Sequence, residues 1–260
     1  MTEEILRILI IQSEISWKDT AGNLQKVSSL VQKSEQSVDL ILLPEMFTTG
    51  FISTPSDVPE GMQEKVLEWL RQTAKSRNCC IAGSMIVSEG NTYYNQLVCA
   101  HPSSETDTYN KRHLFRMAGE EEKYSRGLQR TISRIKGWRI CWQICYDLRF
   151  PVWCRNQGDY DVLVVVANWP ANRGNVWNTL LHARAIENQC YVLGVNRIGK
   201  DGNHIFYQGD SLVIDPKGNR VNDPNKEEEK LIYAELSYSS LLDFRSKFPV
   251  MRDSDNFMFL

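Results

Sequence analysis

The sequence lacks the features that would place the protein in a membrane or on nucleic acid. No apolar run approaches the roughly 20 residues of a membrane-spanning helix, and the acidic opening Met-Thr-Glu-Glu-Ile has no basic signal-peptide region. The 30 basic and 32 acidic side chains nearly cancel to a net charge of -2, which favours neither nucleic acid nor an anionic surface. We therefore expect a cytoplasmic protein with no nucleic-acid or membrane partner.

Internal repeats, low-complexity tracts and Pro/Gly/Ser-rich linkers are also absent. The 260 residues, 42% hydrophobic and 24% charged, suffice for one large core. We expect a single domain over residues 1–260. The segment from about 239 to 260 ends in Phe-Met-Phe-Leu, which is unusually apolar for a chain end, and we expect it to dock on the domain or on a partner subunit.

The cysteine pattern argues against a disulfide framework. The seven residues are odd in number and irregularly spaced, so we expect free thiols in a reducing compartment. Cys141 and Cys145 fall about 13 Å apart on one predicted strand, and no second Cys/His pair with zinc-site spacing accompanies them. We expect neither a metal nor an organic cofactor.

Strand-like and helix-like segments alternate along the chain. Apolar runs rich in β-branched residues predict strands, and apolar positions three or four residues apart predict helices. The predicted strands are 5–12, 40–43, 80–87, 93–100, 106–111, 139–145, 162–167, 191–195 and 208–214, and the predicted helices are 23–34, 62–74 and 178–188. This alternation favours a compact α/β domain of mixed sheets covered by helices.

Three predicted strands end in chemically useful residues. Glu45 follows the run LILLP, Lys111 follows TYN and Cys145 follows ICWQI. Ligands of open α/β sheets bind beyond the carboxyl ends of strands, so an acid, an ammonium and a thiol gathered there would suit acyl transfer. Taken singly, each residue has an ordinary explanation, as a loop carboxylate, a solvated lysine or a packed core thiol. The catalytic hypothesis therefore depends on their coming together.

A cysteine nucleophile is usually paired with a histidine, and the chain has four. His101 and His204 fall in loops and are expected to be exposed, while His182 lies within a predicted helix. His113 is the one candidate partner for Cys145, and this pair remains the alternative mechanism.

Four segments together resemble the nitrilase superfamily of carbon–nitrogen hydrolases. They are LLPEMFTTGF, YNKRHLFRMAGE, ICYDLRFPVW and RAIENQCYV. The resemblance extends from the first predicted strand to about Phe248. Further segments, DLRFPVW and VANWPA among them, resemble its bacterial omega-amidase branch. This resemblance implies a four-layer αββα sandwich that forms a homodimer or a higher homo-oligomer.

The same resemblance implies catalytic roles. Glu45 matches the general base, Lys111 matches the lysine that stabilises the tetrahedral intermediate, and Cys145 matches the nucleophile. The backbone N–H of Tyr146 would complete the oxyanion site. A second family glutamate is matched by Glu120, seven residues before a glycine turn, with the two glutamates that follow it as alternatives.

The substrate implied by the resemblance is the omega-amide of a small 2-oxo dicarboxylic acid. Hydrolysis of 2-oxoglutaramate or 2-oxosuccinamate would give the acid and ammonia through a thioester on Cys145. An N-carbamoyl amino acid amidohydrolase or a deaminated-glutathione amidase is the alternative within the superfamily. A catalytically inactive interaction module is the alternative outside it.

Such a substrate needs a partner for its carboxylate, and arginine suits bidentate binding of that group. The candidates are Arg149 after the thiol, Arg112 beside the lysine, and Arg173. Asn168 and Trp169 end the strand that follows the nucleophile, so we expect them to line the pocket as well.

Overall fold

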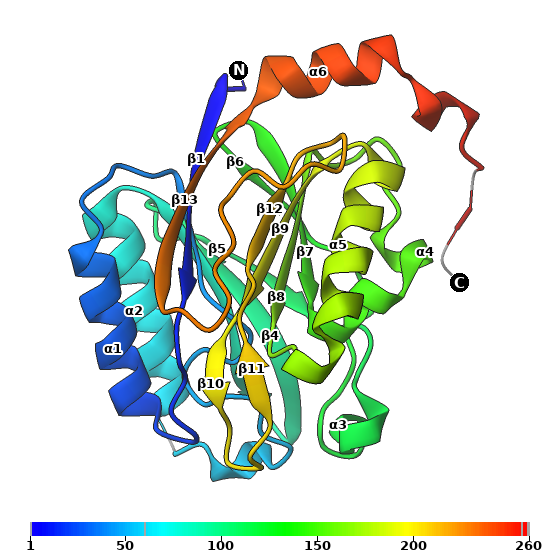
Figure 1. Ribbon diagram of the computed structural model, residues 1–260. Coiled ribbons are helices and arrows are strands. Elements are labelled where there is room, and N and C mark those ends of the chain that lie inside the picture. Colours follow the sequence, from blue (N-terminus) through cyan, green and yellow to red (C-terminus); the bar gives the residue numbers. More distant parts are fainter. Residues whose placement is uncertain (1, 60, 256, 259–260) are drawn as a thin grey trace.

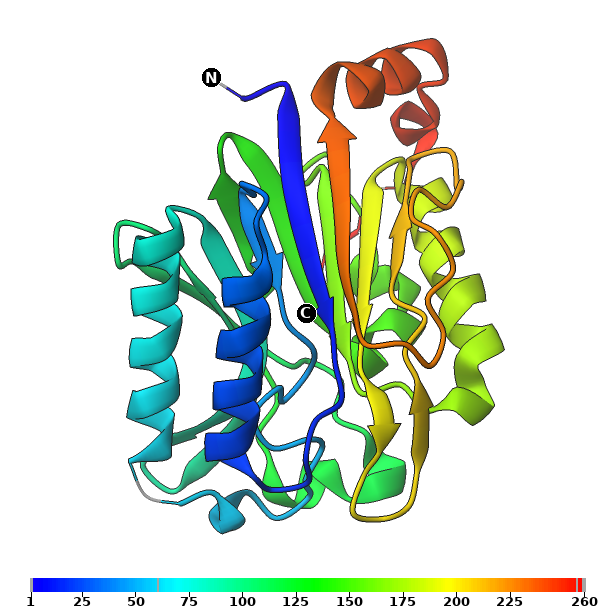
Figure 2. The same ribbon diagram turned by 60° about the vertical axis from the view of Figure 1, so that its left-hand side comes forward.

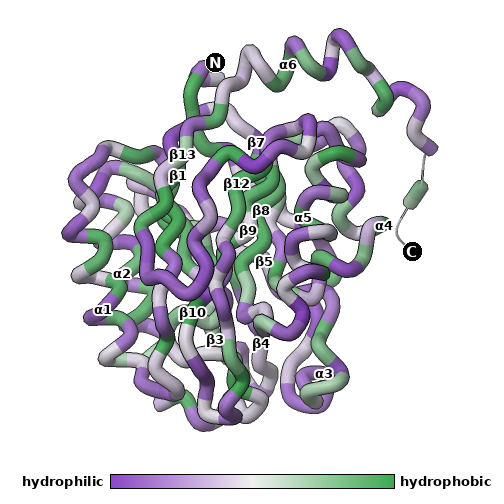
Figure 3. The backbone as a smooth tube through the Cα atoms, viewed as in Figure 1, coloured by the Kyte–Doolittle hydropathy of each residue, from purple (hydrophilic) through white to green (hydrophobic). Residues whose placement is uncertain are grey.

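The computed structural model describes residues 2–59, 61–255 and 257–258. Two main sheets lie face to face and helices cover the outer face of each, which makes four layers in the order α, β, β, α (Figures 1 and 2). Hydrophobic residues are concentrated along the strands between the layers (Figure 3). The predicted four-layer α/β sandwich is confirmed.

The first sheet has six strands. In spatial order they are β13 (Lys230–Ser237), β1 (Ile5–Gln12), β2 (Leu40–Leu42), β3 (Cys80–Glu89), β4 (Thr92–Ala100) and β5 (Thr106–Asn110). Strands β1, β2 and β3 run parallel, while the other neighbours pair antiparallel. The carboxyl ends of β1 to β3 therefore share one edge of the sheet, where ligands can bind.

The second main sheet has five strands. In spatial order they are β12 (Leu212–Ile214), β9 (Tyr191–Asn196), β8 (Val162–Ala167), β7 (Trp138–Ile144) and β6 (Ile132–Ile135). Strands β8 and β9 are buried along their whole length, as expected for parallel strands covered on both faces. A separate antiparallel ribbon is formed by β10 (Ile198–Lys200) and β11 (Phe206–Gln208).

Six α-helices lie within the described residues. They are α1 (Thr20–Lys33), α2 (Met62–Arg77), α3 (Glu120–Lys123), α4 (Pro151–Cys154), α5 (Gly174–Asn188) and α6 (Tyr238–Lys247). Val27, Leu30 and Val31 of α1 are spaced to share one helix face, and they pack in a cluster with residues of β1 to β4. Between the sheets, Ile8 of β1 and Trp142 of β7 belong to one buried cluster. No helix in the described part of the chain is long and apolar enough to cross a membrane.

The predicted strand over 208–214 is wrong, because the chain turns within it. Gly209 and Asp210 have positive φ angles of 72° and 58°, which lie outside the strand region. A Cβ atom at Gly209 would lie 2.4 Å from the Gln12 side chain, so the close approach also requires glycine. The segment instead divides into β11 and β12, which belong to different sheets.

Residues 230–237 form a strand that the sequence pattern does not predict. Strand β13 pairs antiparallel with β1, so that Ser237 lies opposite Ile5 and Lys230 lies opposite Gln12. It lies at the edge of its sheet, and most of its side chains are partly exposed, so its apolar and polar residues do not alternate cleanly.

The segment after β13 contacts the second sheet and its connections through polar groups. Arg245 of α6 donates a hydrogen bond to the Asp161 carboxylate at 2.9 Å. Farther along, the backbone carbonyl of Phe257 accepts a hydrogen bond from Gln157 Nε2 at 3.1 Å. Residues 259–260, the end of the predicted docking segment, lie outside the described residues.

Asp161 joins this C-terminal helix to the second sheet. Its fully buried carboxylate also accepts hydrogen bonds from Arg139 Nε at 2.9 Å and Nη2 at 2.7 Å. Burial opposes the charged form of Asp161, but the hydrogen bonds and charges of Arg139 and Arg245 outweigh it and lower its pKa. A carboxylate whose pKa falls on folding stabilises the native state above its unfolded pKa, near 4, and loses that effect as the pH falls.

Asp161→Asn should lower the free energy of unfolding by about 2–3 kcal/mol at pH 7, because two arginines lose their charged partner. The loss should be smaller at pH 3, because there the carboxyl of the unfolded chain, whose pKa is near 4, is largely protonated and the advantage of the ionised native form is reduced. Urea unfolding of both proteins at the two pH values measures this difference. An equal loss at pH 7 and pH 3 would contradict the ionic role of Asp161.

Candidate active site

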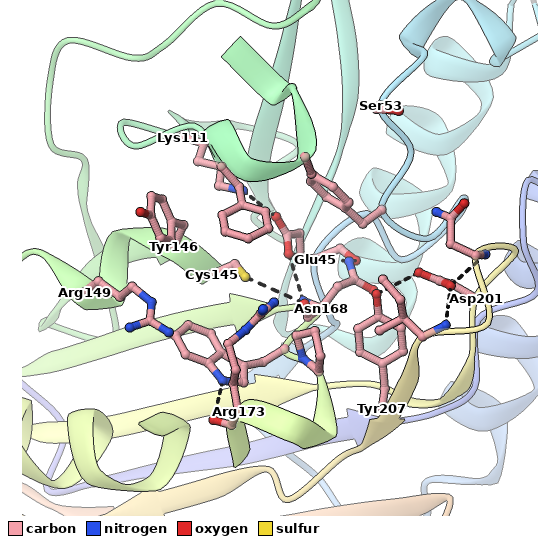
Figure 4. Close-up of a pocket in the computed structure, with 17 residues that line it drawn as sticks. Glu45, Ser53, Lys111, Cys145, Tyr146, Arg149, Asn168, Arg173, Asp201 and Tyr207 are labelled. Atoms are coloured by element: carbon pink, nitrogen blue, oxygen red, sulfur yellow. Dashed lines mark hydrogen bonds and ion pairs between the residues drawn. The ribbon is translucent and has the colours of Figure 1, made fainter. Parts of the chain in front are cut away.

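Three strand ends from the two sheets meet in one cavity. Glu45 follows β2 after a Leu-Pro turn, Lys111 directly follows β5, and Cys145 directly follows β7. All three line a cavity of about 280 Å³ (Figure 4). The structure thus brings together the acid, the ammonium and the thiol that the sequence places at separate strand ends.

The Lys111 ammonium lies between two carboxylates. Its Nζ donates to Glu45 Oε1 at 2.9 Å and to the two oxygens of Glu120 at 3.0 and 2.9 Å. None of the three side chains is more than 1% exposed. Buried charges are tolerated only when they are paired and hydrogen-bonded, so each member of this trio depends on the other two.

The Glu45 carboxylate accepts hydrogen bonds from two neutral donors as well as from Lys111. Its Oε2 accepts a hydrogen bond from Asn168 N–H and its Oε1 accepts one from Asn95 Nδ2, both at 2.8 Å. The next residue, Met46, has a positive φ of 44°, and its N–H donates to Ser84 Oγ at 2.9 Å. The turn after β2 is therefore fixed so that Glu45 enters the cavity.

Of the three consecutive glutamates in α3, the structure brings Glu120 to the lysine. Its Oε2 also accepts a hydrogen bond from Phe115 N–H at 2.6 Å. Glu121 and Glu122 are exposed, so neither occupies this position.

A glycine allows this segment to return past the lysine. Gly127 N–H donates to the backbone carbonyl of Lys111 at 2.8 Å. A Cβ atom at Gly127 would lie only 2.1 Å from the carbonyl oxygen of Asn110, which cannot move without displacing β5. The chain can therefore pass this closely only as glycine.

Cys145 occupies a strained turn. Its φ is +46°, a region that residues other than glycine rarely adopt, and such strain typically costs ~1–3 kcal/mol. The buried carboxylate of Asp147 stabilises the turn by accepting hydrogen bonds from three segments. The donors are Ile144 N–H at 3.0 Å, Tyr109 O–H at 2.7 Å and His113 N–H at 2.8 Å. The end of β7 thereby holds the sulfur at the cavity wall.

His113 is bonded to this structural aspartate and does not line the cavity. Its Nδ1 lies 2.8 Å from Asp147 Oδ1, and its ring stacks on Phe150 with centroids 3.7 Å apart. The geometry therefore gives no support to a Cys145–His113 pair.

Electrostatics keep the resting thiol protonated. Burial raises the pKa of Cys145 well above its usual value, and the Glu45 carboxylate adds to this shift while Lys111 opposes it. Burial also raises the pKa of Glu120 against the opposing effect of Lys111. For Lys111, burial favours the neutral amine, but the charges of Glu120 and Glu45 prevail and raise its pKa. The lysine is therefore charged, and the thiol is neutral at rest.

The cavity wall contains five more of the predicted residues: Tyr146, Arg149, Asn168, Trp169 and Arg173. The Arg149 guanidinium lies 5.1 Å from the Trp169 ring, and that of Arg173 lies 5.4 Å from the Phe115 ring. Within the described residues, neither arginine forms a salt bridge, unlike Arg139 or Arg245.

Arg112, the third predicted carboxylate partner, lies outside the cavity wall. Its Nη1 donates to the Gly127 carbonyl at 3.1 Å, and its guanidinium lies 5.0 Å from the Trp153 ring. Arg112 begins the bend that follows Lys111, and these contacts keep its guanidinium out of the cavity.

One wall of the cavity was not predicted. The loop between β10 and β11 and the start of β11 contribute Asp201, Asn203, Ile205 and Tyr207. The Asp201 carboxylate shapes this wall by accepting hydrogen bonds from the N–H groups at 203 and 205 and from Tyr207 O–H, at 2.8, 3.0 and 2.9 Å. An Asp-Gly-Asn turn signal is the one indication in the sequence, and turn signals do not reveal which loop reaches a site.

A thiol, a lysine and two glutamates at the shared edge of two facing sheets define the class as that of the αββα-sandwich hydrolases. Residues 7–245 match the family described as carbon-nitrogen hydrolase. The chain belongs to this family and is a hydrolase of carbon–nitrogen bonds.

Individual relatives agree with this membership. The omega-amidase YafV of Yersinia enterocolitica is 42% identical over 98% of this chain and 99% of its own. The 2-oxoglutaramate amidase of Bacillus subtilis is 33% identical over 95% of this chain and 96% of its own. The solved structure of XC1258 from Xanthomonas campestris, a CN-hydrolase superfamily protein with an arsenic adduct in the active site, has a TM-score of 0.95 at 40% identity, over 99% of this chain and 100% of its own.

Cys145 should remain a thiol through the neutral range, because burial and Glu45 disfavour its anion. The difference in thiolate ultraviolet absorbance between the wild type and Cys145→Ser should be small at pH 7 and should grow only above the usual thiol pKa of 9.0. A full thiolate difference already present at pH 7 would show that the lysine, rather than burial and Glu45, controls the sulfur.

Proposed function

We propose that the protein is an omega-amidase that hydrolyses the terminal amide of a small 2-oxo dicarboxylic acid, such as 2-oxoglutaramate or 2-oxosuccinamate. The two curated relatives, named as an omega-amidase and a 2-oxoglutaramate amidase, support this assignment. The cavity of about 280 Å³ is slightly smaller than typical ligand pockets, which span roughly 300–1,000 Å³. This size favours a short acyl chain over the longer one of deaminated glutathione.

The observation that carries the proposal is a pair of arginines in the cavity of the thiol that form no ion pair with any acidic side chain that the structure describes. Arg149 and Arg173 line the cavity that contains Cys145. Guanidinium groups bind carboxylates with paired, charge-assisted hydrogen bonds. A substrate with a carboxylate at one end can therefore bind the arginines while its terminal amide reaches the sulfur.

In the first half-reaction, Glu45 takes the thiol proton as Cys145 Sγ attacks the amide carbonyl carbon. Lys111 Nζ and the N–H of Tyr146 stabilise the oxyanion, and loss of one such donor typically costs about 100- to 1000-fold in rate. Glu45 then gives its proton to the amide nitrogen and the C–N bond breaks. Ammonia leaves, and the acyl group remains as a thioester on Cys145.

In the second half-reaction, water adds to the thioester carbonyl while Glu45 accepts a proton from it. The tetrahedral intermediate collapses, the C–S bond breaks, and the proton passes to the sulfur to restore the thiol. Glu120 keeps Lys111 charged and in place through both steps. Because Lys111 is already positioned, little reorganisation is needed when negative charge develops on the oxygen.

Ammonia release should be fastest from 2-oxoglutaramate or 2-oxosuccinamate in a panel that also contains glutamine, an N-carbamoyl amino acid and a simple nitrile. Cys145→Ala should reduce turnover by at least about a thousandfold, because no thioester can form, with an unchanged circular dichroism spectrum. Turnover of only the carbamoyl compound or the nitrile would refute the substrate class. Near-normal activity in Cys145→Ala would refute the thioester mechanism.

Replacing a carboxylate-binding arginine should selectively weaken binding of the charged substrate. Arg149→Gln or Arg173→Gln should raise KM for 2-oxoglutaramate about 10- to 100-fold, with a smaller change in kcat and little effect on an uncharged amide of equal length. Arg112→Gln and the exposed Arg134→Gln serve as controls that should leave the preference for the charged amide unchanged. If Arg149→Gln and Arg173→Gln both weaken charged and uncharged amides equally, neither arginine recognises the carboxylate.

A further inference from the structure

A second group of chemically reactive side chains lies at the opposite end of the first sheet. Cys80 begins β3, Cys99 lies near the end of β4, His101 follows that strand, and Asp107 lies near the start of β5. The two thiol sulfurs and a ring nitrogen of His101 lie within 4.8 Å of one another. The amide hydrolysis described above uses none of these groups.

The strand register places these side chains on one face of the sheet. The β4–β5 pairing sets Cys99 opposite Asp107, and the β3–β4 pairing, extended by one residue, sets Cys80 opposite His101. Opposite residues of antiparallel strands share a face, as do residues two apart on one strand. Cys80 and Cys99 are accordingly buried in the core between the two sheets.

The spacing of the cluster resembles that of a tetrahedral zinc site. Cys80 Sγ lies 3.4 Å from His101 Nδ1. Zinc bonds of about 2.3 Å to sulfur and about 2.0 Å to nitrogen, at tetrahedral angles, hold such ligand atoms about 3.5 Å apart. Cys99 Sγ lies 4.0 Å from His101 Nε2, and since all the ligand atoms lie within 4.8 Å of one another, the widest separation would need to close by about 1.3 Å.

Asp107 orients the histidine in the manner of a metal ligand. His101 Nε2 lies 2.8 Å from Asp107 Oδ2. A hydrogen bond from Nε2–H leaves the lone pair on Nδ1, which is the nitrogen beside Cys80. Metal-bound histidines characteristically donate their other ring N–H to a carboxylate or carbonyl in this way. These contacts also explain why the prediction of an exposed His101 is wrong, since its side chain is only 17% exposed.

We propose that Cys80, Cys99 and His101 bind one Zn²⁺ or a similar thiophilic divalent cation, with water as the fourth ligand and Asp107 as the hydrogen-bond partner of the histidine. Binding releases the two thiol protons, because the thiolate is the form that bonds to the metal. The ion enters from the solvent side, where Asp107 is 38% exposed.

This site is separate from the catalytic cavity although the same strands serve both. Four strand positions separate Cys80 from Ser84 and Cys99 from Asn95, which corresponds to about 13 Å along each strand. Ser84 and Asn95 belong to the network that holds Glu45. A bound ion would join β3 to β4 and stabilise the folded state by mass action, without contact with the reacting atoms.

The test is a Co²⁺ titration of the full chain carrying Cys145→Ala, so that the catalytic thiol cannot contribute, with a phosphine reductant. We expect one Co²⁺ to bind per chain and to give a thiolate-to-cobalt charge-transfer band with the intensity of two cobalt–thiolate bonds. Added Zn²⁺ should displace the Co²⁺ and remove the band. Adding Cys80→Ser or Cys99→Ser should remove the stoichiometric binding. Absence of the band at excess Co²⁺, or its persistence in both serine variants, would overturn the proposal.

Two further variants distinguish the loss of a metal ligand from a failure of the protein to fold. Cys79→Ser alters the adjacent buried thiol, which packs in the cluster on the outer face of the sheet, and should leave Co²⁺ binding unchanged. Asp107→Asn, at a partly exposed position, should weaken binding about 10- to 100-fold with little change in the spectrum. Unchanged affinity in Asp107→Asn, or loss of the band in a folded Cys79→Ser variant, would show that the metal is bound elsewhere.

Discussion

The ammonium of Lys111 between the carboxylates of Glu45 and Glu120 is the interaction on which the site depends. Desolvating one charge of this kind costs several kcal/mol, so the trio persists only because every member is paired and bonded to further donors. Those donors come from β4, from the segment after β5 and from the end of β8. Both sheets must therefore be in register before the charges can be buried.

The Asp147 carboxylate has a similar structural role for Cys145, because it fixes the turn that contains this residue. The positive φ of Cys145 would relax if the surrounding chain allowed it, and the hydrogen bonds that Asp147 accepts prevent that. This arrangement also explains the position of His113. The sequence allows a catalytic pair of His113 and Cys145, but the His113 ring stacks on Phe150 and lies within hydrogen-bond distance of Asp147. His113, two positions after Lys111, therefore supports the turn that holds Cys145 and does not contact the thiol through a hydrogen bond in the described residues.

The layered fold could be predicted because its strongest signals are local. Strand β1 begins and ends where its apolar run does, and α5 extends the predicted 178–188 by one turn at its start. The edge strand β13 and the break at Gly209 and Asp210 could not be predicted, because each depends on contacts with a residue distant in sequence. The same limit applies to the site. Motifs identified Glu45, Lys111 and Cys145 as candidates, whereas the wall around Asp201 and the outward direction of Arg112 are tertiary consequences.

The distribution of charge around the cavity explains how a dicarboxylic monoamide would be oriented. Two carboxylates share one ammonium at the buried end, so with all three ionised that end carries one net negative charge. Arg149 and Arg173 supply positive charge elsewhere on the wall. A substrate carboxylate is repelled from the first region and attracted to the second, and at low effective dielectric both effects favour the same orientation. The uncharged amide would then be the end that reaches Cys145, which links the proposed preference for omega-amides to the buried charges on which the proposed mechanism depends.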